Sequence, residues 1–180
     1  MAELTIPIHE TDHVRGAETA PVTLLIYGDY ECPYTRMAYR AVQRVLADEP
    51  DTLRFVFRHF PLTSIHPHAQ HASEAAEAAA AQGKFWEMHD TLFGRQHALE
   101  DADLARYAQE LGLDVERFTR ALDAHAYASR IQEDVRSGRA SGVQGTPTLY
   151  FNGQLHMRGY DDATLRATIA RIAADAAHAS

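Results

Sequence analysis

Two short apolar stretches in the first third of the chain predict strands on either side of a helix. Residues 22–27 are apolar on both faces, as in a strand buried at the centre of a sheet. Residues 53–58 place their three large apolar side chains on one side. The helix begins at Pro33, and its sheet-facing positions are expected to be Met37, Ala38, Ala41, Val42, Val45 and Leu46. Strand, helix and strand predict a βαβ unit with parallel strands and a right-handed crossover.

The middle of the chain, residues 66–140, is alanine-rich and has helical periodicity throughout. The helices are predicted near residues 67–82, 84–96, 101–111 and 114–139, the last broken near Asp123. Asp101 and Asp114 are expected to be N-caps, and Gly94 and Gly112 to mark helix ends. This segment therefore predicts an all-helical insertion.

Strand character returns after the insertion. Residues 147–151 are followed by Asn152-Gly153, a strong hairpin signal, and then by a return strand over residues 154–157. A last helix is expected from about Asp161, with Leu165, Ile169 and Ile172 at core spacing. The pattern predicts a single α/β domain over residues 1–180. Its two core halves are residues 1–65 and 141–180, and residues 66–140 are the insertion.

Composition and charge narrow the classes of function. An apolar fraction of 46% is sufficient for a globular core. Seventeen basic and 25 acidic residues give a net charge of −8, which argues against a nucleic-acid partner. The start of the chain lacks the pattern of a secretory leader, and the run at residues 22–27 is too short to insert into a membrane. With one cysteine and no disulfide framework, we expect a cytoplasmic protein.

The single cysteine, Cys32, lies in Cys32-Pro33-Tyr34-Thr35, between the first strand and the first helix. The unpaired N–H groups and partial positive charge of a helix N-terminus favour a thiolate there. The Thr35 hydroxyl shares the first turn with the sulfur, whereas Asp29 and Glu31 oppose the thiolate if they lie close. The alternative for Cys32 is an inert, buried thiol.

Three motifs along the chain, the first of which contains Cys32, carry a resemblance to a known family. They are Tyr27-Gly28-Asp29-Tyr30-Glu31-Cys32-Pro33-Tyr34, Arg58-His59-Phe60-Pro61-Leu62 and Val143-Gln144-Gly145-Thr146-Pro147-Thr148. Together the motifs resemble the DsbA-like thioredoxin fold, which is βαβ and ββα around a central mixed sheet with a helical insertion. Ile65-His66-Pro67-His68-Ala69-Gln70 is similar to a run in cytoplasmic thioredoxin-like domains, free-standing or fused to sodium–proton antiporters.

The resemblance implies roles for several residues. Cys32 would be the attacking sulfur, and Thr35 stands where the family has its second cysteine. In the family, the proline matching Pro147 is cis and faces the active-site sulfur, and it presents the backbone of the residue at Thr146 to an extended peptide. Pro33 and Tyr34 join these two residues as substrate-binding candidates.

With one sulfur, a mixed disulfide on Cys32 must be resolved by an outside thiol. We therefore expect a monothiol thiol–disulfide oxidoreductase that removes glutathione from proteins, shuffles disulfides or reduces through a sulfenic acid. No bound cofactor is expected. Glutathione or another thiol is the expected co-substrate, and thiol or disulfide proteins are the expected partners.

Two other functions stay open on the sequence. One is a glutathione-dependent transferase or isomerase of the same fold. The other is a non-catalytic peptide-binding or chaperone module that kept a groove around Pro147. A metal site is not expected, although His66, His68 and His71 are clustered, because no cysteine or carboxylate stands at ligand spacing beside them.

Overall fold

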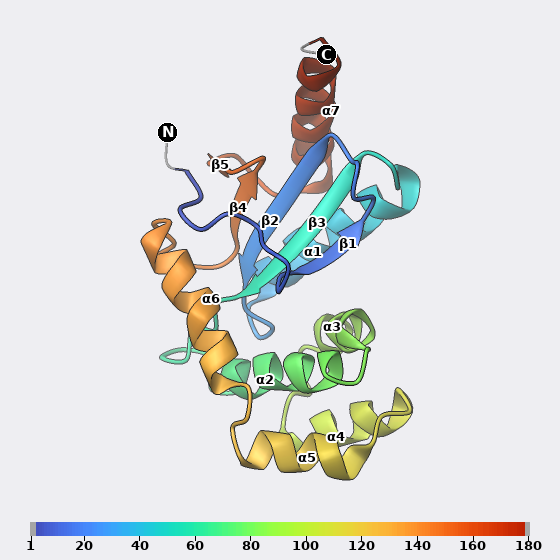
Figure 1. The fold of residues 1–180 in the computed structure, drawn as a ribbon, viewed down its shortest axis with the longest axis vertical. Helices are drawn as coiled ribbons and strands as arrows, with labels where there is room; N and C mark the ends of the chain where they lie inside the picture. Colours follow the sequence, from blue (N-terminus) through green and yellow to red (C-terminus); the bar gives the residue numbers. More distant parts are fainter. Residues whose placement is uncertain (1–2, 179–180) are drawn as a thin grey trace. The chain divides into compact units, whose positions relative to one another are not determined.

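The computed structural model describes residues 3–178, so residues 1–2 and 179–180, at the ends of the two predicted core halves, lie outside the described residues. The elements in chain order are β1 (His13–Gly16), β2 (Val22–Gly28), α1 (Pro33–Asp48), β3 (Leu53–His59), α2 (Ala69–Ala80), α3 (Phe85–Gly94), α4 (Asp101–Glu110), α5 (Val115–Asp123), α6 (Ala128–Ala140), β4 (Thr148–Phe151), β5 (Gln154–His156) and α7 (Asp162–His178). Figure 1 shows them coloured along the chain.

Contacts divide the chain into two compact units. The first comprises Met1–Gly28, Tyr34–Arg58 and Ser137–Ser180, and the second comprises Asp29–Pro33 and His59–Arg136. The second unit thus includes the short segment that carries Cys32, in addition to the region predicted as a helical insertion.

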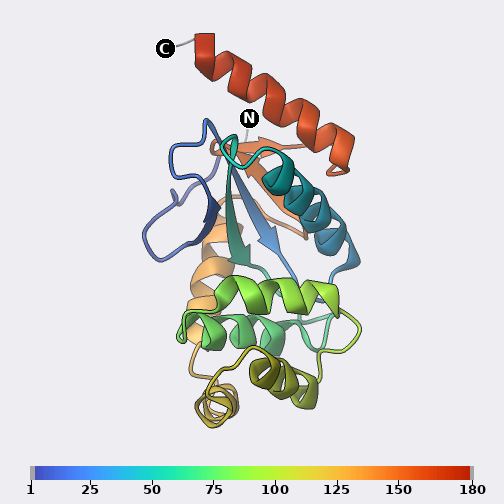
Figure 2. The ribbon, with the colours of Figure 1, turned by 90° about the vertical axis from the view of Figure 1, so that its right-hand side faces the viewer.

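Within the described residues the strands form one five-stranded sheet in the order β1-β3-β2-β4-β5. The pairs β1–β3, β2–β4 and β4–β5 are antiparallel. Figure 2 shows the arrowheads of β2 and β3 at the same end of the sheet, so this central pair is parallel. The mixed sheet confirms the predicted α/β class and the βαβ order at its centre.

The helix α1 begins at Pro33, as predicted, and Ala38, Ala41, Val42 and Val45 are buried, as predicted for its sheet-facing side. The ring of Tyr39 lies 5.6 Å from that of Phe55 on β3, and its hydroxyl accepts a hydrogen bond from Arg15 at 2.8 Å. The prediction that Met37 faces the sheet was wrong, because 54% of this residue is exposed. The buried stripe runs through Tyr39 instead, and Met37 lies outside that stripe.

The last helix, α7, confirms the predicted helix from about residue 161. Leu165 and Ile169 are buried, and α7 packs against β2. Two ion pairs join it to α1: Arg44 Nε lies 3.0 Å from Asp162, and Arg166 pairs with Asp48 at 2.6 Å. Figure 2 shows α1 and α7 on the same side of the sheet.

The hairpin β4–β5 turns at Asn152-Gly153, as predicted. Both residues have positive φ, +47° for Asn152 and +82° for Gly153, which is the requirement of a type I′ turn. The return strand ends at His156, one residue before the predicted end, and 83% of Met157 is exposed.

The second unit is built around α2, which packs against α3, α4 and α5. The predicted break near Asp123 is confirmed, because α5 ends there and α6 starts at Ala128. Asp114 caps α5 by accepting a hydrogen bond from the Arg117 N–H at 3.0 Å. Asp101 is not an N-cap, contrary to the prediction.

The N-cap of α4 is Glu100, one residue earlier than predicted. Its backbone N–H donates to the Asp103 carboxylate at 3.2 Å, in the reciprocal arrangement of a capping box. Asp101 is therefore the first helical residue, where its negative charge still favours the helix N-terminus.

Arg58 on β3 is the centre of a buried polar cluster in the first unit that the sequence pattern did not predict. Its guanidinium donates from Nε and Nη2 to the two carboxylate oxygens of Asp12, each at 2.8 Å. It also donates to the Tyr27 hydroxyl and to the carbonyls of Ile6 and Pro7, each at 2.9 Å. All five N–H donors of the side chain are therefore used. The cluster holds the segment before β1 against the sheet. The edge strand β1 was also not predicted from the sequence.

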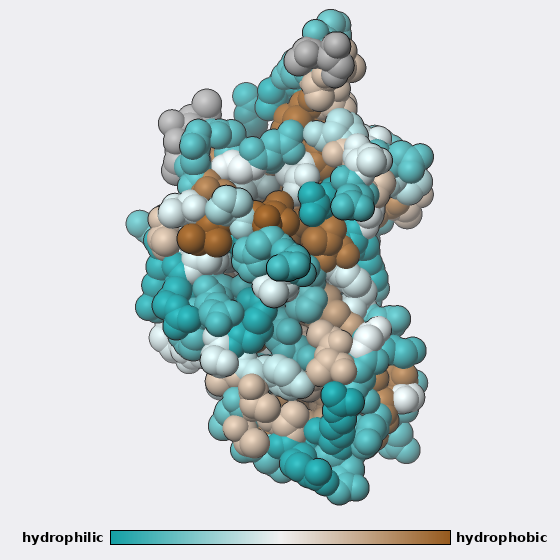
Figure 3. Space-filling view, in the orientation of Figure 1, coloured by the Kyte–Doolittle hydropathy of each residue, from teal (hydrophilic) through white to brown (hydrophobic). Residues whose placement is uncertain are grey.

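The face shown in Figure 3 is largely hydrophilic and carries several apolar patches. Exposed large apolar side chains of the described residues include Ile6, Tyr34, Met37, Ile65 and Met157. No helix within residues 3–178 combines the length and the apolar content that crossing a bilayer requires.

Candidate functional site

Cys32 is the last residue before α1, the position at which helix N–H groups are unpaired. Its own N–H donates to the Asp29 carbonyl at 3.1 Å, so the segment enters the helix through a tight turn. Only 4% of the residue is exposed. The thiol exchange predicted for Cys32 requires an accessible sulfur, whereas this residue is almost entirely buried.

The residues that follow Cys32 divide by exposure. Pro33 and Tyr34 are exposed, with 57% for Tyr34, whereas Thr35 is fully buried. A Cβ atom added at Gly28 would lie 2.6 Å from the Thr35 methyl and 2.5 Å from the Phe57 ring. Thr35 therefore packs closely against the end of β2, where only glycine leaves room for it.

Gln96, which follows α3, holds the backbone beside the sulfur. Its Nε2 donates to the carbonyls of Tyr30 and Cys32, each at 2.8 Å. One amide thus ties both ends of a three-residue segment to the second unit. Gln96 was not predicted as a site residue, because nothing in the local pattern distinguishes it from an exposed polar side chain.

The carboxylate of Asp29 is buried and turned toward hydrogen-bond donors. It accepts from the N–H groups of Glu31 at 2.7 Å and Leu62 at 2.8 Å, and it pairs with His66 Nδ1 at 2.8 Å. Its charge is therefore stabilised by its own partners. The same kind of acid–histidine pair occurs two residues later in the chain.

Glu31 repeats the arrangement with His68. Its two carboxylate oxygens lie 2.8 Å from the His68 N–H and 3.0 Å from Nδ1 of the same residue. Both acid–histidine pairs span 37 residues of sequence, Asp29 with His66 and Glu31 with His68. The equal separation, at matching two-residue steps, is the signal that could have identified these pairs from the sequence.

Tyr30 and His59 are fully buried core residues of the second unit. The Tyr30 hydroxyl and His89 Nδ1 are 2.7 Å apart, and His59 Nε2 lies 2.7 Å from Glu77. The His59 N–H donates to Asp134 at 2.9 Å. Burial raises the pKa of Asp134, although the nearby His59 acts in the opposite direction. These groups form a buried polar cluster within the second unit.

Thr146 and Pro147 lie in the first unit, immediately before β4, and both are half-buried. The peptide bond between them is cis. Thr148, the first residue of β4, donates from its hydroxyl to the Gly145 carbonyl at 2.7 Å, which closes the turn around this peptide. Of the six candidate residues, Cys32, Pro33, Tyr34 and Thr35 are consecutive, and Thr146 and Pro147 form a separate segment.

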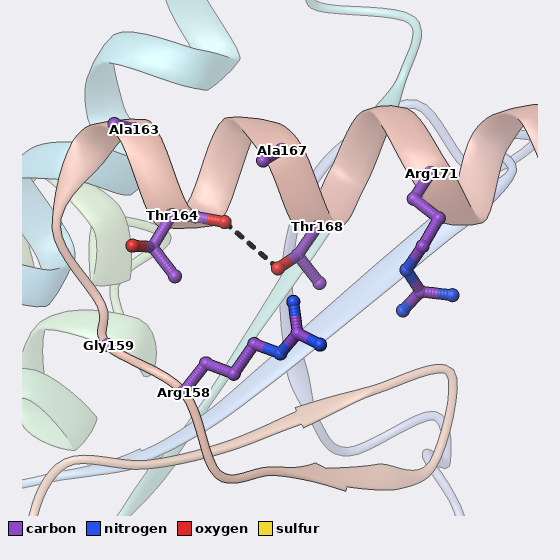
Figure 4. Close-up of a pocket in the computed structure, with 7 residues that line it drawn as sticks. All are labelled: Arg158, Gly159, Ala163, Thr164, Ala167, Thr168 and Arg171. Carbon is purple, nitrogen blue, oxygen red and sulfur yellow. Dashed lines mark hydrogen bonds between the residues drawn. The ribbon is translucent and has the colours of Figure 1, made fainter.

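A cavity of about 590 Å³ lies in the first unit along α7 (Figure 4). Arg158 and Arg171 line it, and the Thr168 hydroxyl donates to the Thr164 carbonyl at 2.9 Å on the same helix. Its lining residues supply no thiol, imidazole or carboxylate. The cavity therefore does not add to the chemistry at Cys32.

Comparison with known families gives a match over most of the chain. The profile of a family described as Thioredoxin matches residues 9–171. The chain is 48% identical over 168 residues to Na(+)/H(+) antiporter NhaA 3 of Salinispora tropica, covering 93% of this chain and 26% of that protein. It is 46% identical over 160 residues to Na(+)/H(+) antiporter NhaA of Herminiimonas arsenicoxydans, covering 89% and 25%. The chain thus spans about a quarter of these curated relatives.

Solved structures share the fold. A thioredoxin-like oxidoreductase from Silicibacter pomeroyi DSS-3 is 28% identical, with a TM-score of 0.77 over 94% of this chain and 93% of that one. Oxidised BdbD from Bacillus subtilis is 24% identical, with a TM-score of 0.77 over 89% and 91%. α-DsbA1 from Wolbachia pipientis is 16% identical, with a TM-score of 0.80 over 96% of each chain. The last two similarities show the fold alone.

Proposed function

This chain belongs to the thioredoxin family, and from that premise we propose that it is a thiol–disulfide oxidoreductase that works with one cysteine. The observation that carries the proposal is the position of Cys32, the only sulfur nucleophile of the chain, directly before a 16-residue helix. Helix N-termini favour anions, and the thiolate is the reactive form of cysteine. The family's second sulfur is replaced by Thr35.

The reaction consists of two exchanges of a disulfide bond. The Cys32 thiolate attacks the glutathione sulfur of a glutathionylated protein. A bond forms between Cys32 and glutathione, the original S–S bond breaks, and the protein thiolate leaves and takes a proton from water. A second glutathione thiolate then attacks the adduct, which regenerates the Cys32 thiolate and forms glutathione disulfide. Across the two exchanges, the glutathionylated protein and one glutathione thiol become the free protein thiol and one molecule of glutathione disulfide.

The surroundings of the Cys32 segment support this chemistry. The carboxylates of Asp29 and Glu31, which would oppose a thiolate, are occupied by N–H donors and by His66 and His68. The Gln96 amide holds the backbone carbonyl of Cys32 itself. A nucleophile fixed in this way loses little freedom when it reacts.

For substrate contact we propose the exposed apolar residues that follow the sulfur. Pro33 and Tyr34 are exposed, and Met37 lies one helical turn beyond Tyr34. Thr146 and Pro147 are assigned the role of presenting backbone to an extended peptide, which rests on the resemblance to the DsbA-like fold. The external thiol is glutathione, and we place the reaction in the reducing cytoplasm.

The test of the monothiol mechanism is turnover of a glutathionylated peptide with and without an external thiol. The wild-type protein is expected to release one equivalent of free peptide without glutathione and then stop, with Cys32 held as a glutathione adduct. Added glutathione is expected to restore continuous turnover. Free-thiol release and intact-protein mass measure the two phases.

The matched variant is Thr35→Cys, which places a second sulfur one helical turn after Cys32. This variant is expected to release glutathione from the adduct by closing an internal disulfide, so that its adduct does not accumulate. Continuous turnover by the wild-type protein without any added thiol would contradict the monothiol mechanism. An equal amount of adduct in wild type and variant would show that residue 35 does not reach the sulfur.

A peptide-binding module is the second candidate, and the 4% exposure of Cys32 favours it. A thiol this buried could be a packing residue of a domain that uses only its exposed apolar surface. The two functions differ in one outcome: a binding module retains peptide affinity in Cys32→Ser and releases no thiol in either form. A glutathione-dependent transferase would retain glutathione binding in the same variant.

A further inference from the structure

A cluster of metal-ligating side chains lies in the second unit, outside the Cys32 segment. His71 and Glu74 stand three residues apart on α2, so the expectation that no carboxylate lies at ligand spacing beside the clustered histidines was wrong. His125 lies in the turn between α5 and α6. One ring nitrogen of each histidine and a carboxylate oxygen of Glu74 all lie within 4.8 Å of one another. The mechanism proposed for Cys32 uses none of these groups.

Glu74 is the buried member of the cluster, with 1% of the residue exposed. Its carboxylate lies 2.9 Å from the Gln70 amide nitrogen and 3.2 Å, at both oxygens, from His125 Nδ1. Burying a carboxylate is unfavourable unless a positive charge compensates it. A divalent cation between Glu74 and the two rings would supply that positive charge.

His125 occupies a backbone position that normally belongs to glycine. The Ala126 N–H donates to the Ala121 carbonyl and the His125 N–H to the Leu122 carbonyl, both at 3.0 Å, which is the Schellman ending of a helix. The left-handed residue of that motif is His125, with φ +48°. A side chain with Cβ is disfavoured there. The His125 imidazole is directed to a buried carboxylate despite this unfavourable backbone position. Its ring nitrogens are therefore candidate ligand atoms.

One ring nitrogen of His71 has a carboxylate partner. Its Nδ1 lies 2.6 Å from the carboxylate of Asp101, the first residue of α4, and its ring centroid lies 5.2 Å from that of His125. Metal-bound histidines commonly use one ring nitrogen for the metal and donate the other N–H to a carboxylate, which fixes the ring. Asp101 is the carboxylate that would take this positioning role.

We propose that His71, Glu74 and His125 bind one divalent transition-metal ion of the zinc type. Two imidazoles and one carboxylate, without a thiolate, match the ligands of zinc sites that keep a fourth position for water. Binding moves the three ligand atoms closer together, and it joins α2 to the α5–α6 turn. The bound ion stabilises the second unit.

The test uses the full chain, freed of metal with EDTA and titrated with zinc chloride by calorimetry. The wild-type protein is expected to take up one zinc ion per chain. His71→Ala and Glu74→Gln are each expected to weaken binding by about 100-fold or more, and Asp101→Asn by about 10-fold, as for a residue that orients a ligand. His97→Ala is the matched control, because this exposed histidine lies outside the cluster, and its affinity should equal that of wild type.

His125→Gly separates a metal ligand from a structural residue. The metal-free variant is expected to unfold at a higher temperature than metal-free wild type, because glycine suits the left-handed position, and yet to lose zinc binding. Zinc should raise the unfolding temperature of wild type and not of this variant. No zinc uptake by wild type, uptake that survives in both His71→Ala and His125→Gly, equal binding of magnesium, or loss of zinc only in Cys32→Ser would each overturn the proposal.

Discussion

Cys32→Ser is expected to lower turnover of a glutathionylated peptide by about 1,000-fold or more, to the rate without protein, since covalent exchange has no other nucleophile in this chain. A serine hydroxyl has nearly the same size but does not form the mixed disulfide. The loss should appear at every glutathione concentration. Peptide thiol release, followed with a colorimetric reagent, measures it.

Two controls keep this result specific to the sulfur. Thermal unfolding of Cys32→Ser must show that the variant is folded at the assay temperature, because the substitution conserves volume but buries a hydroxyl. Met37→Ala, which shortens an exposed side chain of the same helix, should alter the Michaelis constant for a peptide more than the rate of exchange. Equal turnover by wild type and Cys32→Ser would exclude the oxidoreductase and leave the binding module or the transferase.

Arg58→Met is expected to lower the free energy of unfolding by about 3–5 kcal/mol, as for removal of one partner of a buried ion pair. The side chains of Arg58 and Asp12 have no exposed surface. The variant leaves the Asp12 carboxylate without its partner and frees the carbonyls of Ile6 and Pro7. Urea unfolding followed by circular dichroism measures the change.

The control is Arg44→Met, which breaks the exposed pair with Asp162 in the same unit. Exposed pairs contribute about 1 kcal/mol or less, so this variant should remain close to wild type. The double variant Arg58→Met with Asp12→Asn should recover part of the lost stability, because the uncompensated charge is gone. Equal effects of Arg58→Met and Arg44→Met would contradict the importance of the buried cluster.

The same pair predicts how the stability difference depends on pH. Burial acts to raise the pKa of Asp12, but hydrogen bonds from Arg58 and from the His9 N–H outweigh it, and the pKa lies below its usual range. A lowered pKa in the folded state stabilises the protein above the pKa of the unfolded chain, at about pH 3.9. The difference between wild type and Arg58→Met should therefore persist at neutral pH and shrink as the pH falls below about 4.

Local sequence patterns predicted those elements whose backbone geometry is determined by one or two residues. The hairpin at Asn152-Gly153 is specified by two residues that accept positive φ, and the start of α1 by Pro33. The strand β1 was not predicted. It has only four residues and lies at the sheet edge, where polar side chains weaken the apolar pattern of a strand. Met37 was assigned to the wrong face. Small residues lie on both sides of the buried stripe, so the pattern does not determine how the helix is rotated against the sheet.

The polar contacts of the site could not be predicted in the same way. Gln96 reaches a carbonyl 64 residues earlier in the chain, and His125 reaches Glu74 over 51 residues. Such pairs depend on how helices pack, which periodicity does not specify. From the sequence alone, Arg58 would be assigned to the surface, because arginine is rarely buried without a partner. The structure shows its partner, Asp12, buried beside it.

The most direct test of the central claim is adduct formation on the folded protein. Wild type is treated with glutathione disulfide at neutral pH, and intact mass is followed over time, with a urea-unfolded sample in parallel. We expect one glutathione per folded chain, on Cys32, formed faster than in the unfolded sample because the helix start favours the thiolate. An adduct that forms only after unfolding would show that the buried thiol is inert, and would contradict the account.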